Sequence, residues 1–148
     1  MHAAADQLGL PLMLKSRTLA YDGRGNFALR SLDQTEDALK FLGDRPLYAE
    51  KWVPFAREIA VMVVRARDGT VHAYPPVETV HKDNICHLVF APLRSHDASV
   101  ATQAKAVAEQ AVKTFEGAGV FGVEMFLMEN GLCTTFRIAY VFIEVKHR

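Results

Sequence analysis

Apolar and polar positions along this chain predict three helices, of which the clearest lies at residues 98–116. Its apolar residues recur every three or four positions and so share one face. That face comprises Val100, Ala104, Val107, Ala108, Ala111, Val112 and Phe115, with Gly117 and Gly119 as stop signals. The end of another helix is expected at residues 2–8, closed by Gly9. The third should run from an N-cap at Asp33 through Leu42, with Gly43 behind it.

The remaining pattern predicts strands separated by turn residues. Strands are expected at residues 10–15, 26–31, 48–53, 57–66, 70–75 and 120–128. Asp68 and Gly69 form a good hairpin turn, and residues 129–131 form another. Residues 76–92 are expected to be extended or irregular. The pattern therefore predicts an α+β fold with a mostly antiparallel sheet and packed helices.

Composition narrows the class of protein. Half of the 148 residues are hydrophobic, which is enough for a core, and 17 basic residues balance 17 acidic ones. This balance argues against a nucleic-acid binder held by bulk charge. No apolar run reaches the roughly 18 residues of a membrane span. Cys86 and Cys133 lack a CxxC spacing, so we expect a reduced, cytoplasmic protein.

Candidate chemistry begins at Lys15, which ends an apolar segment and precedes a loop containing Gly23 and Gly25. Lysine neutralises a phosphate as a point charge, and glycines let backbone N–H groups converge on one anion. These features favour a loop over the phosphates of a nucleotide. The spacing matches neither G-x-x-x-x-G-K-[S/T] nor G-x-G-x-x-G. An ordinary hairpin turn with a solvated lysine is the alternative.

The order of motifs resembles the ATP-grasp part of 5-(carboxyamino)imidazole ribonucleotide synthetase, which forms the front portion of fungal phosphoribosylaminoimidazole carboxylase. Residues 16–20 are similar to the fungal form of the family. Several motifs agree in order, which is more specific than any single motif. They lie at residues 9–26, 48–52, 57–58, 74–75, 78–85 and 122–126.

The resemblance implies roles for a set of nucleotide-binding residues. Lys15 would contact the phosphates of ATP. A mobile loop would close over them, formed by Ala20, Tyr21, Asp22, Gly23, Arg24, Gly25 and Asn26. A hinge would hydrogen-bond the adenine edge through its backbone, formed by Glu50, Lys51, Trp52 and Val53. Glu58 would accept hydrogen bonds from the ribose, and His81 would be a polar contact near the nucleotide. Trp52 could equally belong to the core, and Glu58 could be a surface carboxylate paired with Arg57.

Glu124 is the expected metal ligand. It stands among apolar neighbours in a predicted strand, where an unpaired carboxylate is costly to bury. The resemblance implies that it binds Mg²⁺, which prefers carboxylates together with substrate phosphates. A zinc site at His81, Cys86 and His87 is the rival interpretation. It is disfavoured because an extended segment points residue 86 away from the other two, and no fourth ligand follows.

The resemblance also implies an activity. ATP would phosphorylate bicarbonate, and the carboxyphosphate would carboxylate aminoimidazole ribonucleotide in purine synthesis. The full-length enzyme would be a homodimer, with no membrane or nucleic-acid partner. No Ser/His/Asp or Cys/His nucleophile arrangement is recognisable, so catalytic residues are unassigned. Two rivals remain: a non-enzymatic nucleotide-binding module and an ATP-grasp ligase with another acceptor.

The resemblance ends after Gly131, which divides the chain into an ATP-grasp domain fragment at residues 1–131 and a divergent tail at 132–148. The tail lacks the Asn-Glu pair that would supply a second magnesium ligand. We therefore expect a fragment with little or no turnover by itself. The β-rich tail could still pair with residues 120–128 across the turn at Asn130 and Gly131.

Overall fold

A computed structural model describes residues 1–20, 24–82, 85–95 and 97–141 of the chain. The chain divides into two compact units. The first comprises Met1–Val53 with His81–Ile85, and the second comprises Pro54–Val80 with Cys86–Arg148. Each unit has its own hydrophobic core.

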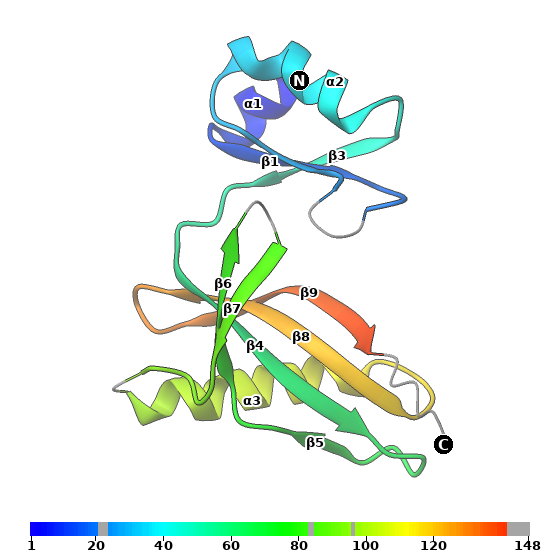
Figure 1. Ribbon diagram of the computed structural model, residues 1–148, viewed down its shortest axis with the longest axis vertical. Coiled ribbons are helices and arrows are strands. Elements are labelled where there is room, and N and C mark those ends of the chain that lie inside the picture. The colour runs from blue at the N-terminus through cyan, green and yellow to red at the C-terminus, as the bar shows by residue number, and fades with distance from the viewer. Residues whose placement is uncertain (21–23, 83–84, 96, 142–148) are drawn as a thin grey trace. The chain divides into compact units, whose positions relative to one another are not determined.

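The first unit is a three-stranded antiparallel sheet with helices on one face (Figure 1). Its elements are α1 (His2–Leu8), β1 (Leu12–Ser16), β2 (Asn26–Leu29), the 3₁₀ turn η1 (Leu32–Gln34), α2 (Thr35–Leu42) and β3 (Leu47–Lys51). The strand order is β2-β1-β3. Side chains alternate between faces along a strand, so one face of β1 is apolar and packs against the helices. This core consists of Ala5, Leu12, Leu14, Leu29, Ala38 and Leu42.

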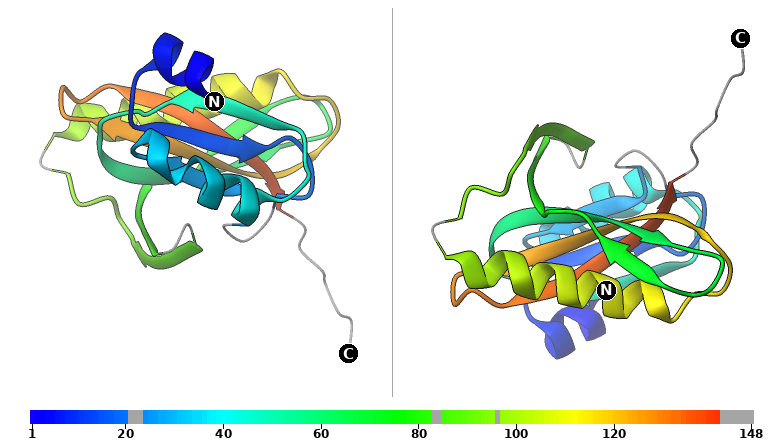
Figure 2. Two further views of the ribbon diagram at one scale, coloured as in Figure 1. Left: turned by 90° about the horizontal axis from the view of Figure 1, so that it is seen from above. Right: turned by 90° about the horizontal axis from the view of Figure 1, so that it is seen from below.

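The second unit is a six-stranded antiparallel sheet with α3 along one face (Figure 2). Its elements are β4 (Phe55–Arg65), β5 (Val71–Ala73), β6 (Val77–Lys82), β7 (Ile85–Phe90), α3 (Ala98–Lys113), β8 (Gly119–Met128) and β9 (Cys133–Val141). The strand order is β7-β6-β4-β8-β9, and β5 pairs with β4. Alternate residues of the two central strands face the helix and are buried, namely Ile59, Val61, Val63, Phe121, Val123, Met125 and Leu127.

The helix predicted at residues 98–116 is α3, and it ends three residues earlier, at Lys113. Its buried residues are Val100, Ala104, Ala108 and Val112, which belong to the predicted face. Val107 is only partly buried at the edge of that face. Phe115 lies beyond the helix and is 40% exposed, although its ring stacks on Phe121 with centroids 5.3 Å apart. The helix therefore buries a narrower stripe than the pattern predicted.

The start of α2 differs from the prediction. Asp33 lies inside η1, where its carboxylate accepts a hydrogen bond from the Ser31 hydroxyl, and Gln34 is the residue that precedes α2. A 3₁₀ turn begins the helix and displaces the cap, as is common at helix ends. The predicted ends at Gly9 and Gly43 are confirmed.

Strands also form at residues 76–92 and in the tail. Residues 76–92, expected to be extended or irregular, form the strands β6 and β7. The hairpin at Asp68 and Gly69 is confirmed, because β5 pairs with β4 beyond it. The pairing foreseen for the tail also forms: β9 runs antiparallel to β8 from Cys133 to Val141. The tail from residue 142 lies outside the described residues.

Candidate functional site

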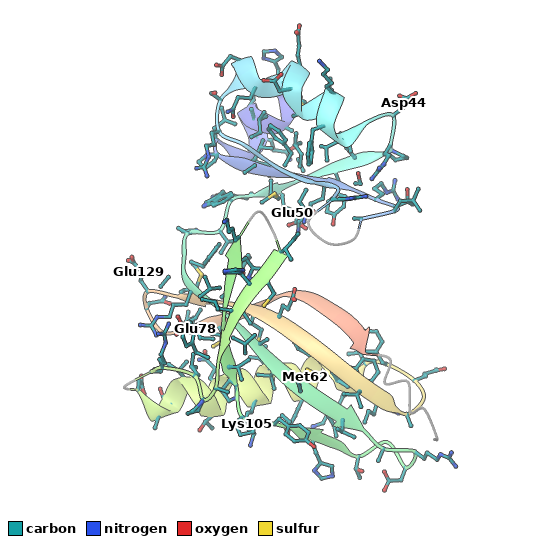
Figure 3. The ribbon with its side chains drawn as sticks, in the orientation of Figure 1. Asp44, Glu50, Met62, Glu78, Lys105 and Glu129 are labelled. Carbon is teal, nitrogen blue, oxygen red and sulfur yellow. The ribbon has the colours of Figure 1, made fainter. Side chains whose placement is uncertain are left out.

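In the first unit, the structure brings Lys15 and Glu50 together on the sheet face opposite the helices. Lys15 alternates with the buried Leu14 and so lies on the other face, where it is opposite Asn26 of β2 and Tyr48 of β3. The Lys15 Nζ atom lies 2.7 Å from Oε2 of Glu50, which Figure 3 labels. The lysine side chain is 19% exposed and the glutamate 46%. This face thus holds one half-buried ammonium group beside a carboxylate that is open to solvent.

The base of the glycine loop is closed tightly at Gly25. The Ser16 N–H donates to the Gly25 carbonyl oxygen over 2.7 Å, and Gly25 has a φ of +95°. A Cβ at this position would lie 2.9 Å from the Cβ of Ala20, closer than real contacts allow. Glycine is therefore required here for both its backbone conformation and its size. Arg24 is exposed beside it, and Tyr21, Asp22 and Gly23 lie outside the described residues.

The predicted adenine hinge, Glu50 to Val53, includes the last two residues of β3 and the two that follow it. Lys51 is the last residue of this strand and is exposed, while Trp52 and Val53 are half-buried. The Arg30 guanidinium lies over the Trp52 ring at 5.7 Å from its centroid. Trp52 is thus neither fully buried nor part of the core of either unit. His81, in β6, is half-buried and is assigned to the first unit.

In the second unit, Glu58 and Glu124 share the sheet face opposite α3. Ala60 of β4 is directly opposite Glu124 of β8, and Glu58 is opposite Phe126, so the two glutamates are diagonal neighbours across the ladder. Such neighbours lie about 7–8 Å apart, within reach of long side chains. Both glutamates are half-buried. A carboxylate such as that of Glu124 supplies the hard oxygen donors that suit Mg²⁺.

Cys86 lies near the same two carboxylates. Partial burial, followed by the charges of Glu124 and Glu58, raises the pKa of the Cys86 thiol. The thiol is therefore protonated at neutral pH, which disfavours a role as nucleophile or as thiolate ligand of zinc. Among the side chains that the structure describes, no group of three or more His, Cys, Asp or Glu residues is placed to hold a metal ion. A magnesium ion at Glu124 would thus need oxygen ligands from a bound phosphate or from water.

Sequence reasoning missed a charge network around the buried Glu78, which Figure 3 labels. The Glu78 side chain is 10% exposed. It accepts hydrogen bonds from Arg94 Nε at 3.1 Å and Nη2 at 2.7 Å, and from Arg57 Nη1 at 3.3 Å. The Arg94 guanidinium also stacks on Phe90, 3.6 Å from the ring centroid. Arg57 therefore pairs with Glu78 on the helix side of the sheet, and this network joins β4 and β6 to the segment before α3.

We expect Glu78→Gln to destabilise the second unit at neutral pH. The Arg94 hydrogen bond lowers the pKa of Glu78, so the carboxylate stabilises the folded state above its unfolded-state pKa, near 4.5, and this contribution is lost as pH falls through the lower folded-state pKa. Both arginines are about half exposed, so we expect a loss of about 2 kcal/mol rather than the larger cost of a fully buried pair.

Urea unfolding at neutral and acidic pH measures this effect, with Glu129→Gln in an exposed turn as the control. The difference between wild type and Glu78→Gln should shrink as pH falls below about 4.5, while Glu129→Gln should follow wild type throughout. A Glu78→Gln variant with unchanged stability at pH 7 would show that the network contributes nothing.

Comparisons with known proteins show which family and which solved structures this chain is similar to. The model of the ATP-grasp domain family matches residues 1–136. The chain is 62% identical over 123 residues to phosphoribosylaminoimidazole carboxylase of Ogataea methanolica. A crystal structure of carboxyaminoimidazole ribonucleotide synthase from Aspergillus clavatus complexed with ATP superimposes with a TM-score of 0.89 at 52% identity. Another from that organism, in complex with ADP and 5-aminoimidazole ribonucleotide, gives 0.84 at 50% identity.

These matches cover most of this chain but a small part of the other proteins. The alignments include 83% of this chain and 22% of the Ogataea protein, and 93% of this chain and 36% of the ATP-bound Aspergillus chain. For the ADP complex the shares are 91% and 34%. None of the helices in the described residues has the length and apolar character needed to cross a membrane.

Proposed function

This chain belongs to the ATP-grasp family, and we propose that it is the ATP-binding part of an enzyme that carboxylates aminoimidazole ribonucleotide in purine biosynthesis. The proposal is supported by the relatives' activity and by the ATP and ADP complexes of the similar structures. The observation that carries the proposal is that the fold brings together two pairs of polar residues. These are Lys15 with Glu50 in the first unit, and Glu58 with Glu124 in the second.

The first unit would bind the phosphates and the base. Lys15 would neutralise a phosphate, because its half-buried ammonium group is held on the open face of the sheet. The loop from Ala20 to Asn26 would contribute backbone N–H groups beside it. The backbone at the end of β3 and directly beyond it, from Glu50 to Val53, would supply one donor and one acceptor to the adenine edge. His81 would be a further polar contact.

The second unit would bind the ribose and the metal. Glu58 would accept hydrogen bonds from the ribose hydroxyls, and Glu124 would hold Mg²⁺ together with phosphate oxygens. Bound magnesium would neutralise charge on the transferred phosphoryl group. Positioning and charge neutralisation are the main contributions of a protein to phosphoryl transfer, so no protein nucleophile is needed.

Bicarbonate and aminoimidazole ribonucleotide would be the further substrates of the whole enzyme, which we place in the cytoplasm as a homodimer. Both described cysteines are free, which fits a reducing compartment. A different acceptor would make this another ATP-grasp ligase, and the acceptor dependence of ATP cleavage distinguishes the two.

Phosphate release from ATP and bicarbonate, measured with and without aminoimidazole ribonucleotide, tests the activity of the purified chain. We expect no ribonucleotide-stimulated release, because residues 132–148 lack the Asn-Glu pair that the resemblance associates with a second magnesium ligand. A metal with one protein carboxylate should leave the phosphates poorly oriented. Stimulated release that is lost in Glu124→Ala would show that these 148 residues suffice for the reaction. Stimulation by a different acceptor would overturn the proposed substrate.

A further inference from the structure

Thr79 carries a buried hydroxyl group that has no hydrogen-bond partner among the described residues. The residue lies in β6 and is 8% exposed, and its Oγ1 atom is fully buried. Burying a hydroxyl without a partner costs folding free energy, and native proteins keep few such groups. Valine has the same shape without this cost, so the hydroxyl at this position calls for an explanation beyond packing.

The position of Thr79 in the sheet offers an explanation for its buried hydroxyl. Thr79 is directly opposite Glu58 in the antiparallel pairing of β6 with β4, so both side chains lie on the sheet face that also carries Glu124. Directly opposite residues have Cβ atoms about 5 Å apart. A glutamate side chain has three rotatable bonds, so the Glu58 carboxylate can reach the neighbouring hydroxyl. Hydrogen bonds to a carboxylate are stronger than those between neutral groups.

We propose that Thr79 is a positioning residue for nucleotide binding: when the nucleotide is bound, its hydroxyl donates a hydrogen bond to the Glu58 carboxylate and fixes that carboxylate toward the ribose. A carboxylate has about four acceptor sites, so Glu58 can accept from Thr79 and from ribose hydroxyls at once. The inference rests on the proposed function, because that assigns the ribose to Glu58. It adds a residue that determines how firmly the ribose is held.

Replacing Thr79 separates this role from packing. Thr79→Val keeps the shape and removes the hydroxyl, so the chain without nucleotide should be as stable as wild type or more stable. Affinity for ATP and for adenosine should fall equally, by about fivefold, since both carry the ribose. Thr79→Ser keeps the hydroxyl and should restore most of the affinity. A purely structural role would instead lower the stability of Thr79→Val and leave the affinity of the folded protein unchanged.

The experiment is calorimetric titration of ATP, adenosine and 2′,3′-dideoxyadenosine into wild type, Thr79→Val and Thr79→Ser, with urea unfolding of each. Thr79→Val should bind the dideoxynucleoside as wild type does, and should cause no further loss in a Glu58→Ala background. Unchanged ATP affinity in Thr79→Val, or an equal loss in the Glu58→Ala background, overturns the positioning role while wild-type ATP binding preserves the proposed function. A folded wild type that binds no ATP overturns both.

Discussion

Val112→Asp should unfold the second unit, with a loss of at least about 4 kcal/mol in the free energy of unfolding. Val112 is fully buried in the core between α3 and the six-stranded sheet, near residues such as Phe121. The substitution removes a buried apolar side chain and puts a carboxylate where it has no partner. A loss of this size is a large part of the stability of an ordinary domain.

Far-UV circular dichroism and urea unfolding measure this effect, with Gln110→Asp as the matched control. Gln110 is exposed on the same turn of α3, so it receives the same charge near the same helix end without burial. We expect Gln110→Asp to cost under about 1 kcal/mol. Val107→Asp should fall between the two, because Val107 is partly exposed and its carboxylate can reach water. Equal stability of Val112→Asp and Gln110→Asp would contradict the described core.

Lys15→Ala should weaken ATP binding by about tenfold or more and leave adenosine binding unchanged. A charge-assisted hydrogen bond to a phosphate contributes about 1.5–3 kcal/mol, and adenosine has no phosphate to lose. The lysine is 2.7 Å from Glu50, so its ammonium group is already held at a fixed place on the sheet face. Calorimetric titration of both ligands into the variant and the wild type measures the difference.

Lys40→Ala is the matched control for Lys15→Ala. Lys40 is exposed in α2, in the same unit, so its removal changes the net charge equally without touching the open sheet face. We expect ATP affinity within about twofold of wild type for Lys40→Ala, because exposed charges are screened by salt. An equal loss for ATP and adenosine in Lys15→Ala would refute a phosphate contact, and an equal loss in both variants would indicate bulk charge alone.

Local signals in the sequence predicted much of the fold. The repeat of apolar residues in α3 and the turn at Asp68 and Gly69 act over a few residues, so their outcome does not depend on distant packing. The predicted N-cap of α2 at Asp33 was wrong. Short polar side chains are found both at helix N-caps and in 3₁₀ turns, and here Asp33 lies in the 3₁₀ turn. The strands β6 and β7 lack a clean alternation of buried and exposed residues, and β7 is almost entirely exposed along its length.

The site was only partly predictable, because its polar pairs depend on strand register. Lys15 and Glu50 are 35 positions apart in the chain and meet only because β1 pairs with β3 in one register. In the sequence, nothing distinguishes Glu78 from other strand carboxylates. Its role follows only from the pairing of β6 with β4 and from its hydrogen bonds to Arg94. The roles of the nucleotide-binding residues stay predictions, and the geometry now says which variants test them.

Calorimetric titration of ATP and adenosine into the wild-type chain with excess Mg²⁺ decides whether this chain binds ATP through its phosphates. We expect saturable binding at one site, with ATP held more tightly than adenosine and the advantage of ATP reduced when Mg²⁺ is removed. A folded wild-type chain that shows no saturable ATP binding, or that binds adenosine as tightly as ATP, would contradict this expectation.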